Sequence, residues 1–263
     1  YSFVSVVNDG YYNYIKINGR TESSTDDVTQ NFLAHIPLLY HSNPETVLNL
    51  GYGGGYTTNT ILLYPSVIQV DNLEIDKTII EADEYVNDNG DPLSDSRVNT
   101  ILADGRNFLS FTDQKYDIII TESSHIWANW QLFTTDFYEI VFDKLADDGI
   151  YSIWIPYYEM DDFDYKVMMN TIHKIFPHII EFDLGADLII LTSKHPISVE
   201  DLDLSWFDVP EIAENFEHMK EVEEINMSNE DWVYSFHSSN LDGYLSNFKE
   251  IQNTITKKTK AIM

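Results

Sequence analysis

The sequence predicts an α/β fold built on a mostly parallel, Rossmann-like sheet, and three observations predict it. An apolar run at residues 47–50 leads directly into a glycine-rich turn at residues 51–55. Glu74 lies 23 positions after Gly51, close to the ~20-residue spacing at which the second strand of such a sheet ends in an acid that binds ribose hydroxyls. Strand and helix signals then alternate, which indicates right-handed crossovers between parallel strands.

The N-terminal part, residues 1–25, is typical of a small β-hairpin region. Residues 3–7 and 12–17 alternate apolar and polar side chains, and the turn signal Asn8-Asp9-Gly10 lies between them. A second turn signal, Asn18-Gly19, marks the exit of the hairpin. From residue 26 to residue 40 the apolar side chains recur at helical spacing, which predicts a helix ahead of the first strand.

Residues 26–196 form the predicted nucleoside-binding catalytic domain. After the first strand we expect strands at residues 67–74, 98–103, 116–122 and 149–156, and a closing antiparallel pair at 179–183 and 188–193. Helices are expected at 77–87, near Arg106, at 134–145 and at 163–176. Seven strands with a terminal hairpin are the layout of the class I S-adenosylmethionine-dependent methyltransferase-like fold. Residues 197–263, acidic and spotted with aromatic side chains, predict a C-terminal helical extension.

Composition excludes several kinds of protein. Lys and Arg number 15 against 44 Asp and Glu, and the formal net charge of −29 would repel nucleic acid and anionic membranes. Such a surface attracts a small cationic amine, and it equally suits a solubilising or salt-adapted role. The absence of cysteine excludes disulfides, a thiolate nucleophile and a Cys-based zinc site.

No apolar run reaches the ~18 residues of a membrane span, so we expect no membrane contact by this segment and a cytoplasmic location. The chain begins at Tyr1 rather than at Met. We therefore also expect further sequence upstream, in which case this segment would be the soluble domain of a larger protein, such as a membrane-anchored one.

Eight short blocks carry a family resemblance. They lie at residues 17–19, 30–38, 47–55, 73–76, 95–98, 103–109, 116–124 and 132–138. Each block is weak alone, but in this order and spacing they resemble the spermidine synthase family, the polyamine aminopropyltransferases, over most of residues 1–196. Residues 104–107, Glu122 with Trp127, and residues 154–158 are most similar to the branch joined to transporter-like membrane segments. By analogy with the family we expect a homodimer.

The resemblance implies transfer of an alkyl group from a sulfonium donor, S-adenosylmethionine or its decarboxylated form, to an amine. In the donor site, the glycine turn would approach the nucleoside through Gly51, Gly53 and Gly55, and Glu74 would bind the ribose. Asp104, with Gly105 behind it, would accept a hydrogen bond from the adenine amino group. The alternatives are a solvated carboxylate at the strand end for Glu74 and a simple Asp-Gly turn for Asp104.

Gln30 matches a family position that contacts the donor, and its alternative is a polar side chain facing out of the first helix. Displacement at the carbon next to S⁺ needs a neutral amine held in line and a group that takes its proton. Glu122, at the carboxyl end of the fourth strand, is the expected catalytic carboxylate. His125 falls where the family has a second acid; it is either a second catalytic base or a structural loop residue.

Three departures from the family pattern concern the transferred group and the substrate. Gly54 replaces an Asp of the glycine turn, Thr29 replaces a Tyr, and residues 182–187 turn straight back into a strand in place of a late substrate loop. Three functions stay open on these grounds: aminopropyl transfer to an amine, methyl transfer on the same scaffold, and noncatalytic nucleoside binding. The histidines lack the spacing of a zinc site, so we predict no metal.

Overall fold

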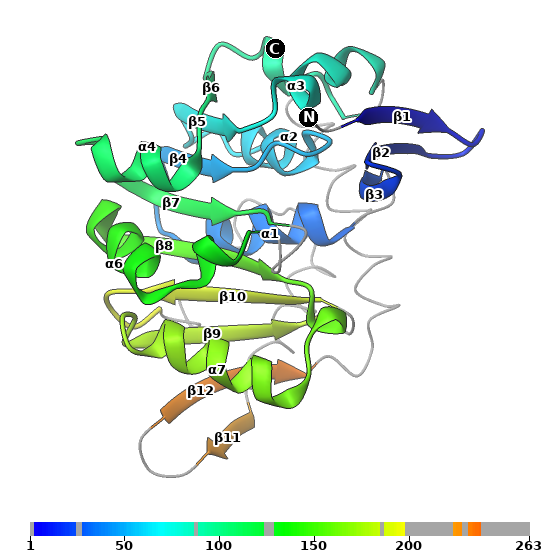
Figure 1. The fold of residues 1–263 in the computed structure, drawn as a ribbon. Coiled ribbons are helices and arrows are strands. Elements are labelled where there is room, and N and C mark those ends of the chain that lie inside the picture. Colours follow the sequence, from blue (N-terminus) through cyan, green and yellow to red (C-terminus); the bar gives the residue numbers. More distant parts are fainter. Residues whose placement is uncertain are drawn as a thin grey trace, which may run out of the picture.

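Nine strands form the main sheet in a computed structural model that describes residues 3–24, 28–86, 89–123, 129–184, 187–197, 223–227 and 231–237. Their order is β11-β12-β9-β10-β8-β7-β4-β5-β6 (Figure 1). The strands are β4 (Thr46–Leu50), β5 (Gln69–Glu74), β6 (Val98–Leu102), β7 (Tyr116–Thr121), β8 (Leu145–Ile155), β9 (His178–Asp183), β10 (Leu188–Ser193), β11 (Glu223–Met227) and β12 (Asp231–His237).

All seven strands expected between residues 26 and 196 are present. The pairs formed among β4, β5, β6, β7 and β8 are parallel, and β10 runs antiparallel to both β8 and β9. The predicted closing pair is therefore confirmed. The short connection predicted between its strands is also present, since only residues 184–187 separate β9 from β10.

Helices cover both faces of the sheet (Figure 1). They are α1 (Val28–Tyr40), α2 (Tyr56–Leu62), α3 (Lys77–Ala82), α4 (Gly105–Phe111), α6 (Thr135–Lys144) and α7 (Asp162–His173), with 3₁₀ turns at Asp83–Tyr85, Pro92–Ser94, Trp130–Phe133 and Tyr157–Glu159. Neighbouring strand residues point to opposite faces, so Val47 packs in the core with α1 and α2 while Leu48 packs in the core with α4, α6 and α7. Both side chains are fully buried, as expected for a parallel sheet covered on two sides.

The N-terminal region is a separate three-stranded sheet of β1 (Val4–Asn8), β2 (Asn13–Ile17) and β3 (Arg20–Ser24). The predicted hairpin is confirmed, and the second turn signal leads into a third strand. Asn18 and Gly19 both have positive φ, 51° and 84°, which is the backbone of the two-residue turns that match the twist of antiparallel strands.

The prediction of a C-terminal helical extension is wrong for residues 223–227 and 231–237, which form the antiparallel strands β11 and β12. β12 adds to the main sheet in parallel beside β9. The reason lies in the sequence: Trp232, Tyr234 and Phe236 alternate with smaller or polar residues, a period of two that favours a strand over a helix. The remaining residues of 198–263 lie outside the described part of the chain, and the predicted domain boundaries stay predictions.

No helix among the described residues is long and apolar enough to cross a membrane.

Helix α1 contains a proline, and a side chain from β8 compensates for it. Pro37 has no N–H to donate to the carbonyl of Leu33, four residues earlier. The hydroxyl of Ser152, fully buried, donates to that carbonyl oxygen at 3.1 Å. Because an unpaired buried carbonyl is costly, this hydrogen bond ties the helix that precedes the sheet to the middle of β8.

Replacing Ser152 with Ala should lower the free energy of unfolding by about 1–3 kcal/mol, because the Leu33 carbonyl would be left buried without a donor. In a Pro37→Ala background residue 37 regains an N–H for the same carbonyl, so the added cost of Ser152→Ala should fall below ~1 kcal/mol. Denaturant unfolding of the four proteins measures this coupling. Ser110→Ala, at an exposed serine of α4, is the control. An equal cost of Ser152→Ala in both backgrounds would contradict the interpretation.

Candidate functional site

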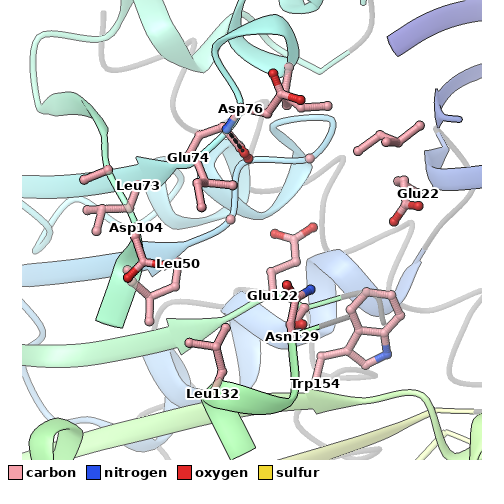
Figure 2. Close-up of a pocket in the computed structure, with 18 of the residues that line it drawn as sticks. Glu22, Leu50, Leu73, Glu74, Asp76, Asp104, Glu122, Asn129, Leu132 and Trp154 are labelled. Atoms are coloured by element: carbon pink, nitrogen blue, oxygen red, sulfur yellow. Dashed lines mark hydrogen bonds between the residues drawn. The ribbon is translucent and has the colours of Figure 1, made fainter. Parts of the chain in front are cut away.

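A cavity of about 600 Å³ opens at the carboxyl ends of the parallel strands. It is lined by the glycine turn after β4, the loops after β5 and β6, the end of β7, Trp154 of β8 and the β2–β3 turn with part of β3 (Figure 2). This is the edge at which open α/β sheets bind ligands. Six predicted site residues line it: Gly51, Gly53, Glu74, Asp104, Gly105 and Glu122.

The glycine turn passes so close to the end of β7 that side chains are excluded. Gly51 has φ +104°, and a Cβ atom there would lie 2.6 Å from the carbonyl oxygen of Glu122. Gly53 has φ +54°, and its Cβ would lie 3.1 Å from the Oε1 atom of Glu122. Position 51 therefore requires glycine for conformation and for space, and position 53 requires it for conformation and leaves only a tight fit beside the Glu122 side chain. The result is a bare backbone on the cavity wall.

Gly55, predicted to bind the nucleoside with the other two glycines, is not among the residues that line the cavity. It has φ +80°, and a Cβ atom there would lie 2.5 Å from the hydroxyl of Tyr52. That hydroxyl donates to Asp83, whose carboxylate also accepts a hydrogen bond from Asn89 at 2.6 Å. The requirement for glycine at this position is therefore explained by packing beneath the turn.

Glu74 ends β5 and lines the cavity with a carboxylate that is held at both oxygens. Oε2 accepts the backbone N–H of Tyr52 at 3.1 Å, and Oε1 accepts that of Asp76 at 2.8 Å (Figure 2). Burial raises the pKa of Glu74, against the opposing effect of the backbone N–H groups that favour the ionised form. The carboxylate is thus fixed in orientation at the cavity, and the alternative of a solvated strand end does not fit its 9% exposure.

Asp104 both caps a helix and lines the cavity. Its Oδ1 accepts the N–H of Asn107 at 2.8 Å at the start of α4, as the turn-forming alternative would have it. The same side chain lies near Leu50 and Leu73 of the cavity wall (Figure 2). An acceptor next to an apolar wall suits a planar base with an exocyclic amino group.

Glu122 follows β7, where its N–H donates to the carbonyl of Leu50 at 3.0 Å. Its carboxylate points into the cavity (Figure 2). Gln30 of α1 does not line the cavity and does not face outward, since it is 1% exposed and donates from Nε2 to Oε1 of Glu122. Ser23 of β3 donates in turn to Oε1 of Gln30 at 2.8 Å. His125 lies outside the described residues.

Several cavity residues had not been selected from the sequence. Ser123 is 3% exposed and its hydroxyl has no hydrogen-bond partner among the described residues. Trp154, one of the residues similar to the branch with membrane segments, donates from its indole nitrogen to Asp187 at 2.9 Å, and Thr29 donates to the other oxygen of that carboxylate at 3.1 Å. Thr29 thus helps to hold the Trp154 ring on the cavity wall.

The described lining is strongly acidic. It contains five carboxylates, from Glu22, Glu74, Asp76, Asp104 and Glu122. The cation among these lining residues is Arg20 of β3. The carboxylates of Glu22 and Glu122 are directed toward the same space (Figure 2). Glu22 comes from the N-terminal sheet. The family block at residues 17–19 belongs to this sheet and also contributes to the lining, but no pattern in the sequence indicated Glu22 itself. Such a lining favours positively charged ligands.

His41, Asp117 and Asp148 bring metal-type ligand atoms within 4.8 Å of one another, away from this cavity. The Nδ1 atom of His41 accepts the backbone N–H of Asn43 at 3.2 Å, so the neutral ring carries its proton on Nε2. Nε2 faces Asp148 at 3.8 Å. A protonated Nε2 is a donor to the carboxylates rather than a metal ligand.

Comparison with known proteins extends these observations. The model of the spermine/spermidine synthase domain matches residues 26–201. A polyamine aminopropyltransferase of Agathobacter rectalis is 30% identical over 198 residues, which cover 71% of this chain and 70% of the relative. A polyamine aminopropyltransferase from Streptococcus pneumoniae serotype 4 is 32% identical over 193 residues, which cover 69% of this chain and 68% of the relative.

Solved structures show the same fold. Spermidine synthase from Thermotoga maritima has a TM-score of 0.66 at 24% identity, over 82% of this chain and 86% of that one. Human methyltransferase-like protein 13, solved in complex with SAH, has a TM-score of 0.51 at 18% identity, over 73% of this chain and 88% of that one. The structural likeness supports the methyltransferase-like sheet predicted from the order of elements. Because the domain match covers most of the sequence, this chain belongs to the spermine/spermidine synthase domain family.

Proposed function

We propose that this chain transfers an aminopropyl group from decarboxylated S-adenosylmethionine to a small amine in polyamine biosynthesis. The observation that carries the proposal is the cavity in which Glu122 faces the space beside the strand-end acids Glu74 and Asp104. The two relatives described above, 30% and 32% identical, are polyamine aminopropyltransferases. These relatives make an enzyme a better account than a noncatalytic nucleoside-binding module.

The proposed roles follow from the contacts at the site. Glu74, held by two backbone N–H groups, accepts hydrogen bonds from the ribose hydroxyls. Asp104 accepts one from the adenine amino group beside the leucine wall. The bare backbone at Gly51 and Gly53 lets the nucleoside approach the turn. The family resemblance and the position of these residues at one edge of the sheet support the assignment.

The reaction needs a neutral amine next to the sulfonium. The amine nitrogen attacks the aminopropyl carbon that is bonded to S⁺. The bond between that carbon and sulfur breaks with its electron pair on sulfur, and methylthioadenosine leaves. The new ammonium gives up a proton, which the Glu122 carboxylate accepts. The protein contributes chiefly by holding the two reactants in line.

The acidic lining favours the decarboxylated donor over S-adenosylmethionine itself, because five carboxylates repel the carboxylate of the full methionine group. The family has an Asp at the position of Gly54. Since glycine carries no charge, this position does not contribute to the preference for the decarboxylated donor. A Cβ atom at Gly54 would lie 2.5 Å from Ser23 and 2.7 Å from Tyr56, so the space for an acid is filled. We therefore assign the amino end of the transferred group to the lining acid Glu22, whose carboxylate is directed toward the same space as that of Glu122.

Methyl transfer is the second candidate, and Arg20 is the observation that favours it. As a cation lining the cavity, Arg20 offers a partner for a methionine carboxylate.

The cytoplasmic location, the homodimer and the relation to the branch with membrane segments stay predictions.

Calorimetry should show that decarboxylated S-adenosylmethionine binds at least about tenfold more tightly than S-adenosylmethionine, since one unfavourable charge contact of ~1.4 kcal/mol changes the Kd tenfold. Methylthioadenosine, which lacks both charged groups, should bind with intermediate or similar affinity. Tighter binding of S-adenosylmethionine would favour the methyltransferase, and no binding of any of the three would reject both enzymes.

Glu122→Gln should lower kcat about 10²- to 10⁴-fold, the usual contribution of a general base. The donor Kd should stay within about threefold, because the amide keeps the shape of the side chain and Glu122 is not assigned to the nucleoside. Steady-state kinetics and calorimetry measure the two effects. Glu139→Gln, an exposed residue of α6, is the matched control. Full activity of Glu122→Gln would remove Glu122 from the catalytic role.

Glu74→Ala should weaken donor binding about 10- to 100-fold, because hydrogen bonds to a charged group contribute ~1.5–3 kcal/mol. In the unchanged protein donor affinity should fall on acidification, and at a higher pH than for an ordinary glutamate, because burial raises the pKa of Glu74 and protonation removes an acceptor. The exposed Glu84→Ala serves as the control for calorimetry. Unchanged affinity in Glu74→Ala would refute the ribose assignment.

A further inference from the structure

A buried chain of hydrogen bonds joins the N-terminal sheet to the carboxylate of Glu122. We propose that Ser23 and Gln30 are positioning residues that hold this carboxylate in the orientation needed to receive the proton of the amine. The proposal rests on the function proposed above, and it goes beyond that function because it gives Gln30 a role through Glu122 and gives Ser23 a role in the reaction.

The direction of each hydrogen bond is fixed by chemistry. An ionised carboxylate can only accept, so the amide nitrogen of Gln30 must face Glu122. The amide oxygen of Gln30 then faces Ser23, whose hydroxyl must donate to it at 2.8 Å. The ionised carboxylate thus sets the orientation of the amide, because a flipped amide would present its oxygen to another acceptor, and Ser23 completes the chain by donating to the amide oxygen.

The surroundings make this chain rigid. Ser23 and Gln30 are each 1% exposed, so water does not compete for their hydrogen bonds and the bond to the charged group is strengthened. Gln30 comes from α1 and Ser23 from β3. The orientation of Glu122 therefore depends on how the small sheet is seated against the main domain.

The glycine turn packs against the hydrogen-bonded groups of Ser23, Gln30 and Glu122. A Cβ atom at Gly53 would lie 3.1 Å from Oε1 of Glu122 and 3.3 Å from Nε2 of Gln30, and one at Gly54 would lie 2.5 Å from Oγ of Ser23. Side chains at these two positions would displace the hydrogen-bonded groups. The absence of side chains at Gly53 and Gly54 thus leaves room for the chain of hydrogen bonds as well as for a ligand.

A positioning role predicts effects on turnover that are separate from donor binding. Gln30 does not line the cavity, so its loss should leave the donor site intact. Its loss also removes a donor that favours the ionised form of the carboxylate. Activity should then require a higher pH, because the base is protonated more readily.

The experiment compares Gln30→Leu, Ser23→Ala and the double variant with the unchanged full chain. We expect kcat to fall about 10- to 100-fold in Gln30→Leu, which is the scale of a ~1 Å misplacement of a reacting group. In Ser23→Ala we expect kcat to fall about three- to tenfold. The donor Kd should stay within about twofold of the original value in both variants. The acid side of the pH profile of kcat/KM should move to higher pH. The double variant should be no slower than Gln30→Leu, because the two residues act in series.

Ser110→Ala, at the exposed serine of α4, is the control and should leave kinetics unchanged. Thermal unfolding checks that each variant is folded. If Gln30→Leu does not fold, the proposal is tested with Ser23→Ala, which is the smaller change. Weakened donor binding with unchanged kcat would make Gln30 a donor ligand and overturn the proposal. Independent losses in the double variant, or no shift of the pH profile, would also overturn it. If the protein without substitutions neither binds the donor nor transfers the aminopropyl group, the proposed function is rejected, and the positioning role is rejected with it.

Discussion

The close approach of three strand ends around Gly51 is the constraint on which the site depends. The N–H of Gly51 donates to the carbonyl of Leu73 at the end of β5, and the N–H of Glu122 donates to the carbonyl of Leu50 at the end of β4. These two hydrogen bonds continue the sheet one residue past its strands on both sides of β4. They bring Glu74 and Glu122 to either side of one turn, and they leave no room for a Cβ atom at its first residue. A residue larger than glycine there would separate the two acids by pushing β7 away.

Charge gives the second level of organisation. The chain carries a formal net charge of −29, which alone says little about function because acidic surfaces serve many purposes. The cavity brings five lining carboxylates together. Glu74 among them is buried, and burial strengthens electrostatic interactions. A sulfonium and an amine are the ligands that such a lining suits. The same lining opposes the carboxylate of S-adenosylmethionine, and this is the physical basis of the proposal that the donor is the decarboxylated form.

The N-terminal sheet is part of the site rather than an appendage. Glu22 and Arg20 of β3 line the cavity, and Ser23, between them and α1, is bonded to Gln30. Alternation along one strand thus presents Ser23 to the buried contacts and its neighbours to the cavity side or to solvent. Thr29 and Asp187 hold Trp154 from the other side. The walls of the cavity therefore come from segments that lie far apart in the sequence.

The sequence by itself determined the order of strands and helices between residues 26 and 196, the glycine turn and the strand-end positions of Glu74, Asp104 and Glu122, because hydrophobic periodicity and backbone requirements of glycine are local properties. It did not reveal that Gln30 faces Glu122, that Gly55 packs on Tyr52, or that β3 lines the cavity. Residues 223–227 and 231–237 form strands rather than the predicted helical extension, because the alternation of aromatic residues favours a strand. Only the tertiary structure decided these points, since contacts between β3, α1 and β7 depend on how separate elements pack, and no local pattern in a single sequence records that packing.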